Sequence, residues 1–398
     1  MHSIRSVNPV GGGPIEGVKQ LSRVNGDRGH TVEVVSLDSP DAPWLADFPL
    51  PLHPLGPAWG KYGYAPRYVH WLRENAHRYD IVIVNGIWQY NSFGTWRALH
   101  NGTLPYVVFT HGMLDPWFRR QYPLKHLKKW FYWPWGDYRV LRDAAVVLFT
   151  CEQERRLARQ SFWLYRADEL VVNYGTAGPA GDAEVQTRAF ADRFPELAGR
   201  RLLLFLGRVH PKKGADLLLE AFHDWLASDS EDARTDWQLV IAGPDDHAYA
   251  GELRALAERL GITSRVTWTG MLQGDLKWGA LRNAEVFILP SHQENFGIAV
   301  AEALACGTPV LISKEVNIWR EIVNDDAGLV EADDRAGTLR LLQRWEALPE
   351  RERQTMRENA RSCFERRFHV ERAADSLAEA LSLYAMVGAR ALPSSTTG

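Results

Sequence analysis

Two pairs of side chains in the second half of the chain have types and spacings that suit chemistry. Glu294 and Glu302 are eight residues apart, and Arg208 and Lys213 are five apart. Paired carboxylates can exchange protons at a reacting bond or accept hydrogen bonds from the hydroxyl groups of a ligand. Two neighbouring cations can bind a diphosphate and stabilise the charge that gathers on it as its bond to a sugar breaks. The alternative is an ordinary solvated basic turn, but their placement between a strand and a helix favours a functional role.

The surrounding residues predict the elements that position these groups. The apolar run 285–290 closes on a proline and predicts a buried strand, and residues 298–305 predict a helix that Gly307 ends. A strand, a glycine-containing turn and a helix start form a natural anion site, because unpaired helix amides and the helix dipole point at the ligand. Residues 294–297 are therefore predicted to be a ligand loop.

The same alternation of apolar runs and helices extends along the chain and predicts an α/β fold with parallel sheets covered on both faces. Residues 176–199 lose this rhythm and are predicted to be a linker between two domains of similar size. Predicted strands are 4–7, 31–37, 80–86, 106–112, 144–150, 169–172, 201–206, 238–242, 265–268, 286–289 and 309–312; predicted helices include 15–28, 152–160, 215–227 and 298–305.

Composition limits the classes of function. A net charge of -3 gives no global attraction to nucleic acid, so none is expected as a partner. Three widely spaced cysteines predict neither a disulfide framework nor a metal cluster, and favour a reducing cytoplasm. No apolar run approaches the roughly 20 residues that span a bilayer.

Polar or glycine-rich segments follow many of the predicted strands, and ligands of open parallel sheets bind outside these carboxyl ends. A glycine after a strand is often only a turn, but the agreement of so many sites favours a cleft between two domains. The segments are 11–13, 111–112, Gly175, 207–214, 243–246, Gly270 and 294–297.

A glycosidase would place both carboxylates beside one bond. Glu302 lies inside the predicted helix and Glu294 precedes it, and eight helical residues advance about 12 Å. This spacing better suits carboxylates that bind separated hydroxyl groups, such as those of a ribose and a sugar ring. No Asp-x-Asp pair ends a strand, so a metal-bridged diphosphate is not indicated.

Together these residues resemble the signature of the retaining glycosyltransferases of family 4, which have the GT-B fold. The resemblance covers nearly the whole chain, and the Glu-x7-Glu block with its flanks is its most specific part. The matching residues are Pro290-Ser291, 294–297, Glu302-Ala303, 305–310, Gly207-Arg208, Lys213-Gly214, 11–13, 28–32 and 111–117.

The resemblance implies two Rossmann-like parallel-sheet domains that face each other across a cleft. Residues 1–176 would form an N-terminal acceptor domain and 200–368 a donor domain, joined by a linker at 177–199. A helix at 369–388 would return to the N-terminal domain, before a disordered tail at 389–398.

The resemblance also implies roles for single residues. His111, Arg208, Lys213 and Glu294 would be catalytic: the two cations would hold the donor diphosphate, while Glu294 and His111 would face the sugar. Glu302 would bind the ribose hydroxyls. The implied donor site is Gly12, Gly13, Gly175, Gly207, Arg208, Lys213, Gly270, Met271, Leu272, Glu294, Asn295, Phe296, Gly297, Ile298 and Glu302. Residues 173–177 depart from the family pattern, so the resemblance supports the donor contact of Gly175 less strongly than the other contacts.

The implied reaction moves a hexose from a nucleotide-diphosphate sugar to a saccharide or lipid-linked saccharide acceptor, with no metal and no cofactor, in polysaccharide or glycoconjugate assembly. A front-face attack, in which the departing phosphate takes the acceptor proton, is the preferred hypothesis. Two alternatives remain: a sugar-nucleotide epimerase of the same architecture, and a non-catalytic nucleotide-sugar sensor.

Residues 117–135 are basic and densely aromatic. Such a segment suits a lipid interface, with cations toward the headgroups and rings toward the acyl chains. An ordinary core-packing helix with a solvated face is the alternative, and the sequence slightly favours it. With a lipid-linked acceptor, the expected location is the cytoplasm, at the inner face of the membrane.

Overall fold

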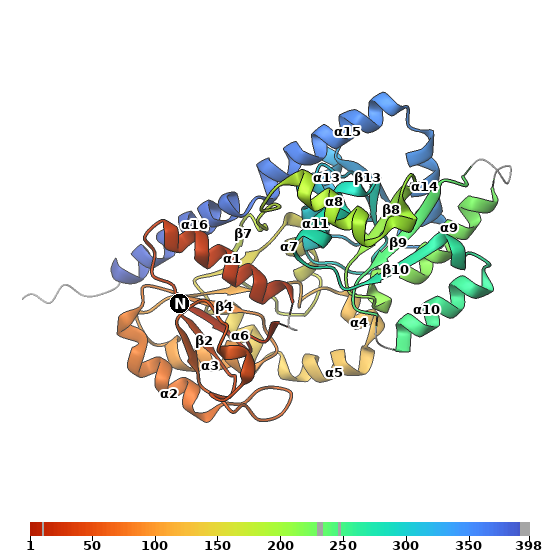
Figure 1. Cartoon of the computed structure of the whole chain (residues 1–398). Coiled ribbons are helices and arrows are strands. Elements are labelled where there is room, and N and C mark those ends of the chain that lie inside the picture. Colours follow the sequence, from red (N-terminus) through yellow and green to blue (C-terminus); the bar gives the residue numbers. More distant parts are fainter. Residues whose placement is uncertain (10–11, 229–233, 246–247, 391–398) are drawn as a thin grey trace, which may run out of the picture. The chain divides into compact units, whose positions relative to one another are not determined.

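The computed structural model describes residues 1–9, 12–228, 234–245 and 248–390, and it divides into two compact units (Figure 1). The first unit contains residues 1–174 and the C-terminal helix that starts at Val370. The second contains residues 175–369. Gly11, Asp246 and the acidic segment 229–232 lie outside the described residues, as does the tail from 391 onward.

The first unit has a seven-stranded sheet in which all strand pairs are parallel, in the order β3-β2-β1-β4-β5-β6-β7. The strands are β1 His2–Ile4, β2 Val34–Ser36, β3 Leu52–Pro54, β4 Val82–Asn85, β5 Tyr106–Phe109, β6 Val146–Phe149 and β7 Glu169–Val171. The helices are α1 Gly13–Asp27, α2 Pro66–Asn75, α3 Tyr90–Leu99, α4 Trp117–Gln121, α5 Pro123–Tyr132, α6 Asp137–Arg142, α7 Glu152–Ala158 and α16 Val370–Arg390, with 3-10 turns η2 Pro43–Leu45 and η3 Ala76–Arg78.

The second unit has a six-stranded parallel sheet in the order β10-β9-β8-β11-β12-β13. Its strands are β8 Arg201–Leu206, β9 Trp237–Ala242, β10 Val266–Gly270, β11 Val286–Leu289, β12 Val310–Ser313 and β13 Gly328–Glu331. The helices are α8 Ala183–Arg193, α9 Ala215–Ala227, α10 Ala248–Arg259, α11 Gly274–Asn283, α12 Ile298–Ala305, α13 Trp319–Asn324, α14 Arg335–Ala347 and α15 Glu350–Cys363, with short turns η4 Pro195–Leu197, η5 Pro211–Lys213, η6 Thr263–Arg265 and η7 Phe364–Phe368.

The predicted α/β class with two parallel sheets is confirmed. In each sheet the order in which successive strands are added reverses once, between β1 and β4 in the first unit and between β8 and β11 in the second. At such a switch point the loops that leave two neighbouring strands run to opposite faces of the sheet, so a crevice opens at the carboxyl ends of the strands.

The segment 177–199, predicted as a linker, contains α8 and is part of the second unit. Asp182 caps this helix by accepting hydrogen bonds from the amides of Glu184 and Val185. Phe190 is buried, and Gly279 of α11 lies so close to the Gln186 carbonyl that a Cβ atom would collide with it. The helix is short and polar, and for this reason the composition of the segment predicted a linker between domains instead of a helix.

Two edge strands have no counterpart in the sequence prediction. β3 lies in the proline-rich segment 49–57, and an edge strand tolerates proline because one side of it needs no hydrogen-bond partner. β13 is an edge strand of the second sheet; it has four residues and pairs with β12. The first strand is also earlier than expected, at β1 rather than 4–7.

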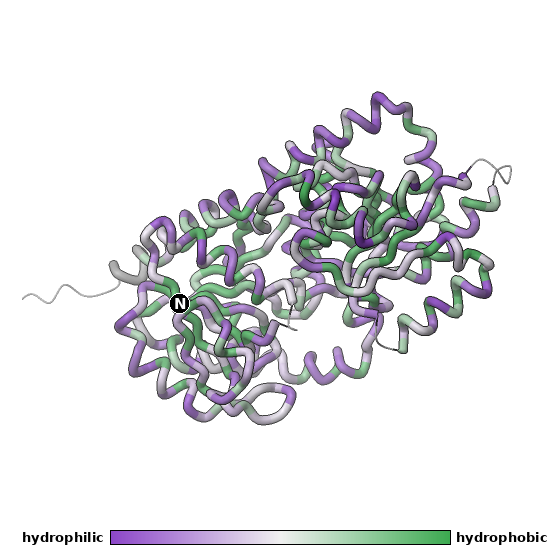
Figure 2. The backbone as a smooth tube through the Cα atoms, in the orientation of Figure 1, coloured by the Kyte–Doolittle hydropathy of each residue, from purple (hydrophilic) through white to green (hydrophobic). Residues whose placement is uncertain are grey.

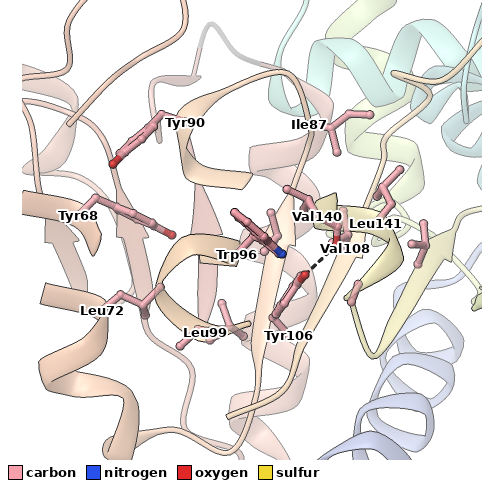
Figure 3. Packing of buried hydrophobic residues seen from close by; sticks show 14 of the residues in the cluster. Tyr68, Leu72, Ile87, Tyr90, Trp96, Leu99, Tyr106, Val108, Val140 and Leu141 are labelled. Atoms are coloured by element: carbon pink, nitrogen blue, oxygen red, sulfur yellow. Dashed lines mark hydrogen bonds between the residues drawn. The ribbon is translucent and has the colours of Figure 1, made fainter. Parts of the chain in front are cut away.

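Apolar residues gather on the strands of each unit, as the hydropathy colouring shows (Figure 2). In the first unit a large buried cluster joins the sheet to α2, α3 and α6 (Figure 3). Tyr106 lies within it and donates a hydrogen bond of 2.8 Å from its hydroxyl to the Val140 carbonyl. This pairing satisfies a polar atom that burial would otherwise leave without a partner. The rigid sheet that results holds the loops at its carboxyl edge.

Candidate active site

Arg208, Lys213 and Glu294 lie in two loops of the second unit that meet at its switch point. One loop runs from Gly207 to Gly214 after β8, and the other from Pro290 to Gly297 after β11. The His292 amide donates to the Lys212 carbonyl at 2.8 Å. Gly214 has a φ of 67°, and a Cβ atom there would collide with the Pro290 carbonyl. The two loops are therefore held together by their backbones.

Lys213 and Glu294 form an ion pair between these loops. Both side chains are mostly buried, with 19% and 18% of their surfaces exposed. Burial lowers the pKa of the Lys213 ammonium, and the positive charges of Lys212 and Arg208 act in the same direction. The Glu294 carboxylate opposes this shift, because a contacting negative charge favours the charged ammonium. Arg208 is exposed in the same loop and acts electrostatically on Lys213, so two cations lie near each other at the switch point.

The backbone of Glu294 is fixed by a third loop, which follows β12. Its amide donates to the Glu315 carbonyl at 2.9 Å, and its carbonyl accepts from the Asn317 amide at 3.0 Å. Gly297 then adopts a φ of 79° and caps the start of α12. The predicted ligand loop is thus a preorganised turn at a helix N-terminus, where amides lack intrahelical partners.

The other predicted donor residues of this turn lie beside it. Phe296 is buried, and its ring packs edge-on against Phe368 at 5.6 Å. Asn295 is half-buried, and Ile298 is the first residue of α12.

Glu302 lies inside α12, as predicted, and is 7% exposed. Its carboxylate pairs with the ammonium of Lys277 on α11 at 2.6 Å. Lys277 was not among the predicted site residues. The only feature of the sequence that points to Lys277 is its position in the first half of a helix that follows β10. This feature is too weak to identify Lys277 as a site residue without the fold.

Gly270, Met271 and Leu272 lie outside the two loops that contain Lys213 and Glu294. Gly270 ends β10, an edge strand that β9 separates from β8. The Gly243 amide donates to the Gly270 carbonyl at 2.9 Å, and a Cβ atom on Gly243 would collide with the Gly207 carbonyl. Met271 is 62% exposed. The structure places these residues at the same edge of the sheet as Gly207.

Gly175 lies outside these loops. A Cβ atom on it would collide with the Phe368 carbonyl, and the next residue, Thr176, pairs with His369. Close packing of the backbone explains the glycine without a ligand. Its predicted donor contact stays a prediction.

In the first unit, Gly12 and Gly13 start α1 after β1. Gly12 has a φ of 75° as the N-cap, and Gly13 is the first helical residue. α1 has fifteen residues, and its first turn contains Pro14 and Glu16. The glycines therefore lie at a helix N-terminus on the carboxyl side of the sheet.

His111 follows β5 and has a φ of 48°, an uncommon value for a residue with a side chain. Burial lowers the pKa of its imidazole to about 4, so the ring is neutral at pH 7. Its Nε2 atom lies 3.2 Å from Oδ1 of Asn85, the last residue of β4. Strain of this kind persists only where neighbours impose it, and it is common at functional sites.

The neighbour that imposes this conformation is Glu154 of α7, which sequence analysis did not identify. One of its oxygens accepts from the Thr110 hydroxyl at 2.8 Å and from the Gly112 amide at 2.6 Å. The other accepts from the amide and the hydroxyl of Thr150, both at 2.8 Å. Glu154 is 3% exposed and therefore fixes both residues that flank His111.

Within the described ranges, no group of three or more His, Cys, Asp or Glu side chains is arranged to hold a metal ion. The loop after β8 contains the cations Arg208, Lys212 and Lys213.

Two protein families match the chain. Residues 12–175 match the glycosyl transferase 4-like domain, and residues 188–362 match the glycosyl transferases group 1.

Curated relatives include D-inositol 3-phosphate glycosyltransferases. That of Acidothermus cellulolyticus is 33% identical over 184 residues, which cover 44% of this chain and 40% of the relative. That of Geodermatophilus obscurus is 35% identical over 215 residues, which cover 50% and 46%. The chain thus spans less than half the length of these relatives.

Solved structures share the fold over nearly the whole chain. Sucrose-phosphate synthase from Thermosynechococcus elongatus has a TM-score of 0.74 at 21% identity, covering 98% of this chain and 99% of its own. Anabaena HepE in complex with UDP and glucose also has a TM-score of 0.74, at 18% identity, covering 96% and 98%. With its two parallel-sheet units and both family matches, this chain has the GT-B fold and belongs to glycosyltransferase family 4.

Proposed function

We propose that this protein transfers a hexose from a nucleotide-diphosphate sugar to a hydroxyl group of a saccharide or lipid-linked saccharide, with retention of configuration and without a metal ion. The observation that supports this most is the convergence of Arg208, Lys213 and Glu294 at the switch point of the second sheet. Two cations beside a helix N-terminus suit a diphosphate, and a carboxylate next to them suits sugar hydroxyls. Glu302 is the proposed partner of the ribose.

The proposed step is a front-face displacement. The bond between the anomeric carbon and the diphosphate oxygen breaks, and the acceptor oxygen bonds to the same face of that carbon. The acceptor proton passes to the departing phosphate oxygen, while Arg208 and Lys213 stabilise the negative charge of the leaving group. A glycosyl-enzyme trapped on any carboxylate would contradict this step.

The first test is a thermal-shift screen of UDP, GDP and ADP and their sugars, since a ligand at 100 times its dissociation constant adds about 2.7 kcal/mol of stability. UDP-glucose is the first donor to try, because HepE is known in complex with UDP and with UDP-glucose. The stabilising donor is then incubated with saccharide acceptors and a chelator. A new glycoside whose anomeric configuration matches the donor supports the proposal, and loss of transfer in chelator contradicts metal independence.

Two other functions give different outcomes in the same assay. An epimerase converts the donor alone and needs no acceptor. A nucleotide-sugar sensor is stabilised by the donor but turns over nothing. Either result would replace the proposed transfer.

The acceptor side suits polysaccharide or glycoconjugate assembly at a membrane surface, and we place the protein at the inner face through α5. None of this helix is buried, unlike a core-packing helix. Leu124, Leu127 and Phe131 are 77%, 51% and 65% exposed, and Trp135 beyond its end is 69% exposed. The described helices include none that is both long and apolar enough to cross a bilayer.

The charges of this surface favour anionic lipid. Residues 117–135 contain five Lys and Arg residues and no Asp or Glu. Basic side chains beside exposed rings and leucines suit a headgroup layer, where each cation near the surface is worth about 1 kcal/mol. The segment is anchored by Trp133, which is fully buried and donates to the Trp163 carbonyl at 2.8 Å.

Sedimentation with vesicles tests this placement. We expect binding to vesicles that contain anionic lipid at low salt, weaker binding at high salt, and loss of binding in Leu127→Glu/Phe131→Glu. Val185→Glu is the control, because Val185 is 54% exposed in the second unit. Failure of the unaltered protein to sediment at low salt, or equal loss in the control, would contradict the membrane surface.

A further inference from the structure

Asn85 has a side chain whose orientation is fixed by its surroundings. It is 5% exposed at the end of β4. Its Nδ2 atom lies 3.3 Å from the carbonyl oxygens of both Ser3 and Ile83, and 3.2 Å from Nδ1 of His2. Backbone carbonyls only accept hydrogen bonds, so the amide nitrogen must face them. The oxygen of Asn85 therefore faces His111.

This orientation determines which nitrogen of His111 carries the proton. Oδ1 of Asn85 can only accept, and it lies 3.2 Å from Nε2 of His111. A hydrogen bond at this distance requires a proton on Nε2. A neutral imidazole carries one proton, so Nδ1 is left as an acceptor.

The ring is also held in place by its other neighbours. It stacks on Phe109 with the planes inclined by 16° and the centroids 5.4 Å apart, and Tyr174 meets it edge-on at 6.2 Å. The Glu154 carboxylate holds Thr110 and Gly112 on either side of it. Backbone, ring plane and proton position are thus each set by a different neighbour.

We propose that Asn85 is a positioning residue that locks His111 in the Nε2-protonated tautomer, so that Nδ1 accepts a hydrogen bond from a hydroxyl group of the donor sugar. This inference rests on the proposed function for the identity of the ligand. The tautomer itself does not depend on that function. The imidazole then acts by hydroxyl recognition, because it has no proton to give from Nδ1.

The burial of the ring supports the same assignment. His2 lies on the other side of the Asn85 amide, and both imidazoles have pKa values lowered by burial, to about 3 for His2 and about 4 for His111. A charged His111 would carry protons on both nitrogens and lose its acceptor. Burial therefore preserves the acceptor across the physiological range of pH.

The test is 15N NMR of the full-length protein labelled at histidine, with the His111 signals assigned by their disappearance in His111→Gln. We expect Nε2 to show a protonated-type shift and Nδ1 an unprotonated-type shift at pH 7. Asn85→Ala should move the His111 signals toward values averaged between tautomers. Protonation at Nδ1 in the unaltered protein, or unchanged His111 signals in Asn85→Ala, would overturn the proposal.

Asn91→Ala is the matched control. Asn91 is fully buried in the same region and donates from its side chain to the backbone carbonyl of Asn85 at 3.2 Å, so its removal takes away a contact of the Asn85 backbone rather than one of the Asn85 side chain. It should lower stability while leaving the His111 tautomer unchanged. If Asn85→Ala does not fold, the shifts of the unaltered protein still decide the tautomer.

Kinetics separate this inference from the proposed function. With a donor and acceptor established, Asn85→Ala should lower kcat/KM about tenfold or more, and Asn91→Ala by less than about threefold. If no donor sugar is transferred by the unaltered protein, the proposed function fails while the NMR result still stands. Transfer with an unchanged kcat/KM in Asn85→Ala would overturn the positioning role alone.

Discussion

Each signature carboxylate of the second unit has a lysine of its own. Glu294 pairs with Lys213, and Glu302 pairs with Lys277 at 2.6 Å. These pairs limit the cost of burying four charged groups, since a buried charge without a partner is strongly unfavourable. Under the proposed function, a donor whose diphosphate binds Lys213 would compete with the Glu294 contact and make this carboxylate available to the sugar. The two proposed roles are therefore coupled.

Arg208→Ala and Lys213→Ala should each lower kcat about 100-fold, with a smaller change in the affinity for the donor. The reason is that their charge matters most when the leaving group gains negative charge, where one such contact is worth roughly 3 kcal/mol. Steady-state kinetics with calorimetric donor binding measures both quantities. Lys212→Ala is the control from the same loop, because Lys212 binds His292 through its backbone carbonyl. An equal loss in the control would point to general damage.

The buried imidazoles predict that the first unit is destabilised by acid. Their folded pKa values of about 3 for His2 and about 4 for His111 lie below the ordinary 6.5, so the unfolded chain binds more protons. This stability is complete above pH 6.5 and is lost as the pH falls toward the folded values. Between pH 7 and pH 5 the free energy of unfolding should fall by roughly 2 kcal/mol for each imidazole.

Urea unfolding at the two pH values measures this loss, and His2→Gln should reduce it. His70→Gln should not, since the His70 side chain is 79% exposed. A loss of the same size in His2→Gln and the unaltered protein would show that other groups cause it.

At the scale of elements, the site of the second unit depends on glycines where loops meet. Gly214→Ala should cost at least about 2 kcal/mol more than Gly199→Ala. Both positions have positive φ, 67° and 72°, so both lose the conformational freedom of glycine. Only Gly214 faces a carbonyl, that of Pro290, whereas no atom lies within 4 Å of a Cβ on Gly199. Chemical denaturation with donor-binding assays compares them, and equal costs would show that the loop contact is unimportant.

The sequence predicted the strands that position the site because continuous apolar runs ending in glycine are a local signal. It also predicted that Glu294 precedes a helix and that Glu302 lies within it. It missed Lys277, Asn85 and Glu154 because each acts through a partner distant in the sequence, and only the order of the strands reveals such partners. It mistook α8 for a linker because a short polar helix has little periodicity, and its packing depends on Gly279 of α11.

At the scale of the whole molecule, the first unit is assembled from both ends of the chain. α16 lies along α1, and the two are drawn together in red and blue (Figure 1). Arg28, just after α1, pairs with Glu371 at 2.6 Å and with Asp375 at 2.9 Å. Leu377 is 1% exposed on the buried face of α16. The last helix is therefore a structural part of the first sheet domain.

Leu377→Ala should lower the free energy of unfolding of the first unit by about 2–4 kcal/mol, because it leaves a cavity under α16. Leu383→Ala on the same helix should have little effect, since Leu383 is 56% exposed. Calorimetry should show a lower transition temperature for the first unit only. A donor that binds the second unit should raise the transition temperature of that unit. A shift of both transitions in Leu377→Ala would mean that the units unfold together.

The pairing of Thr176 with His369 has a consequence for how the protein is made. The ribosome releases the whole first sheet before the second unit, but it releases the helix that covers α1 only after the second unit. Until then the nascent first sheet domain exposes the apolar side of α1. The second unit is an insertion between the two parts of the first, and the residues near its two ends, Thr176 and His369, pair with each other. A premature stop codon just before Val370 would therefore leave an uncovered first domain beside an intact second one.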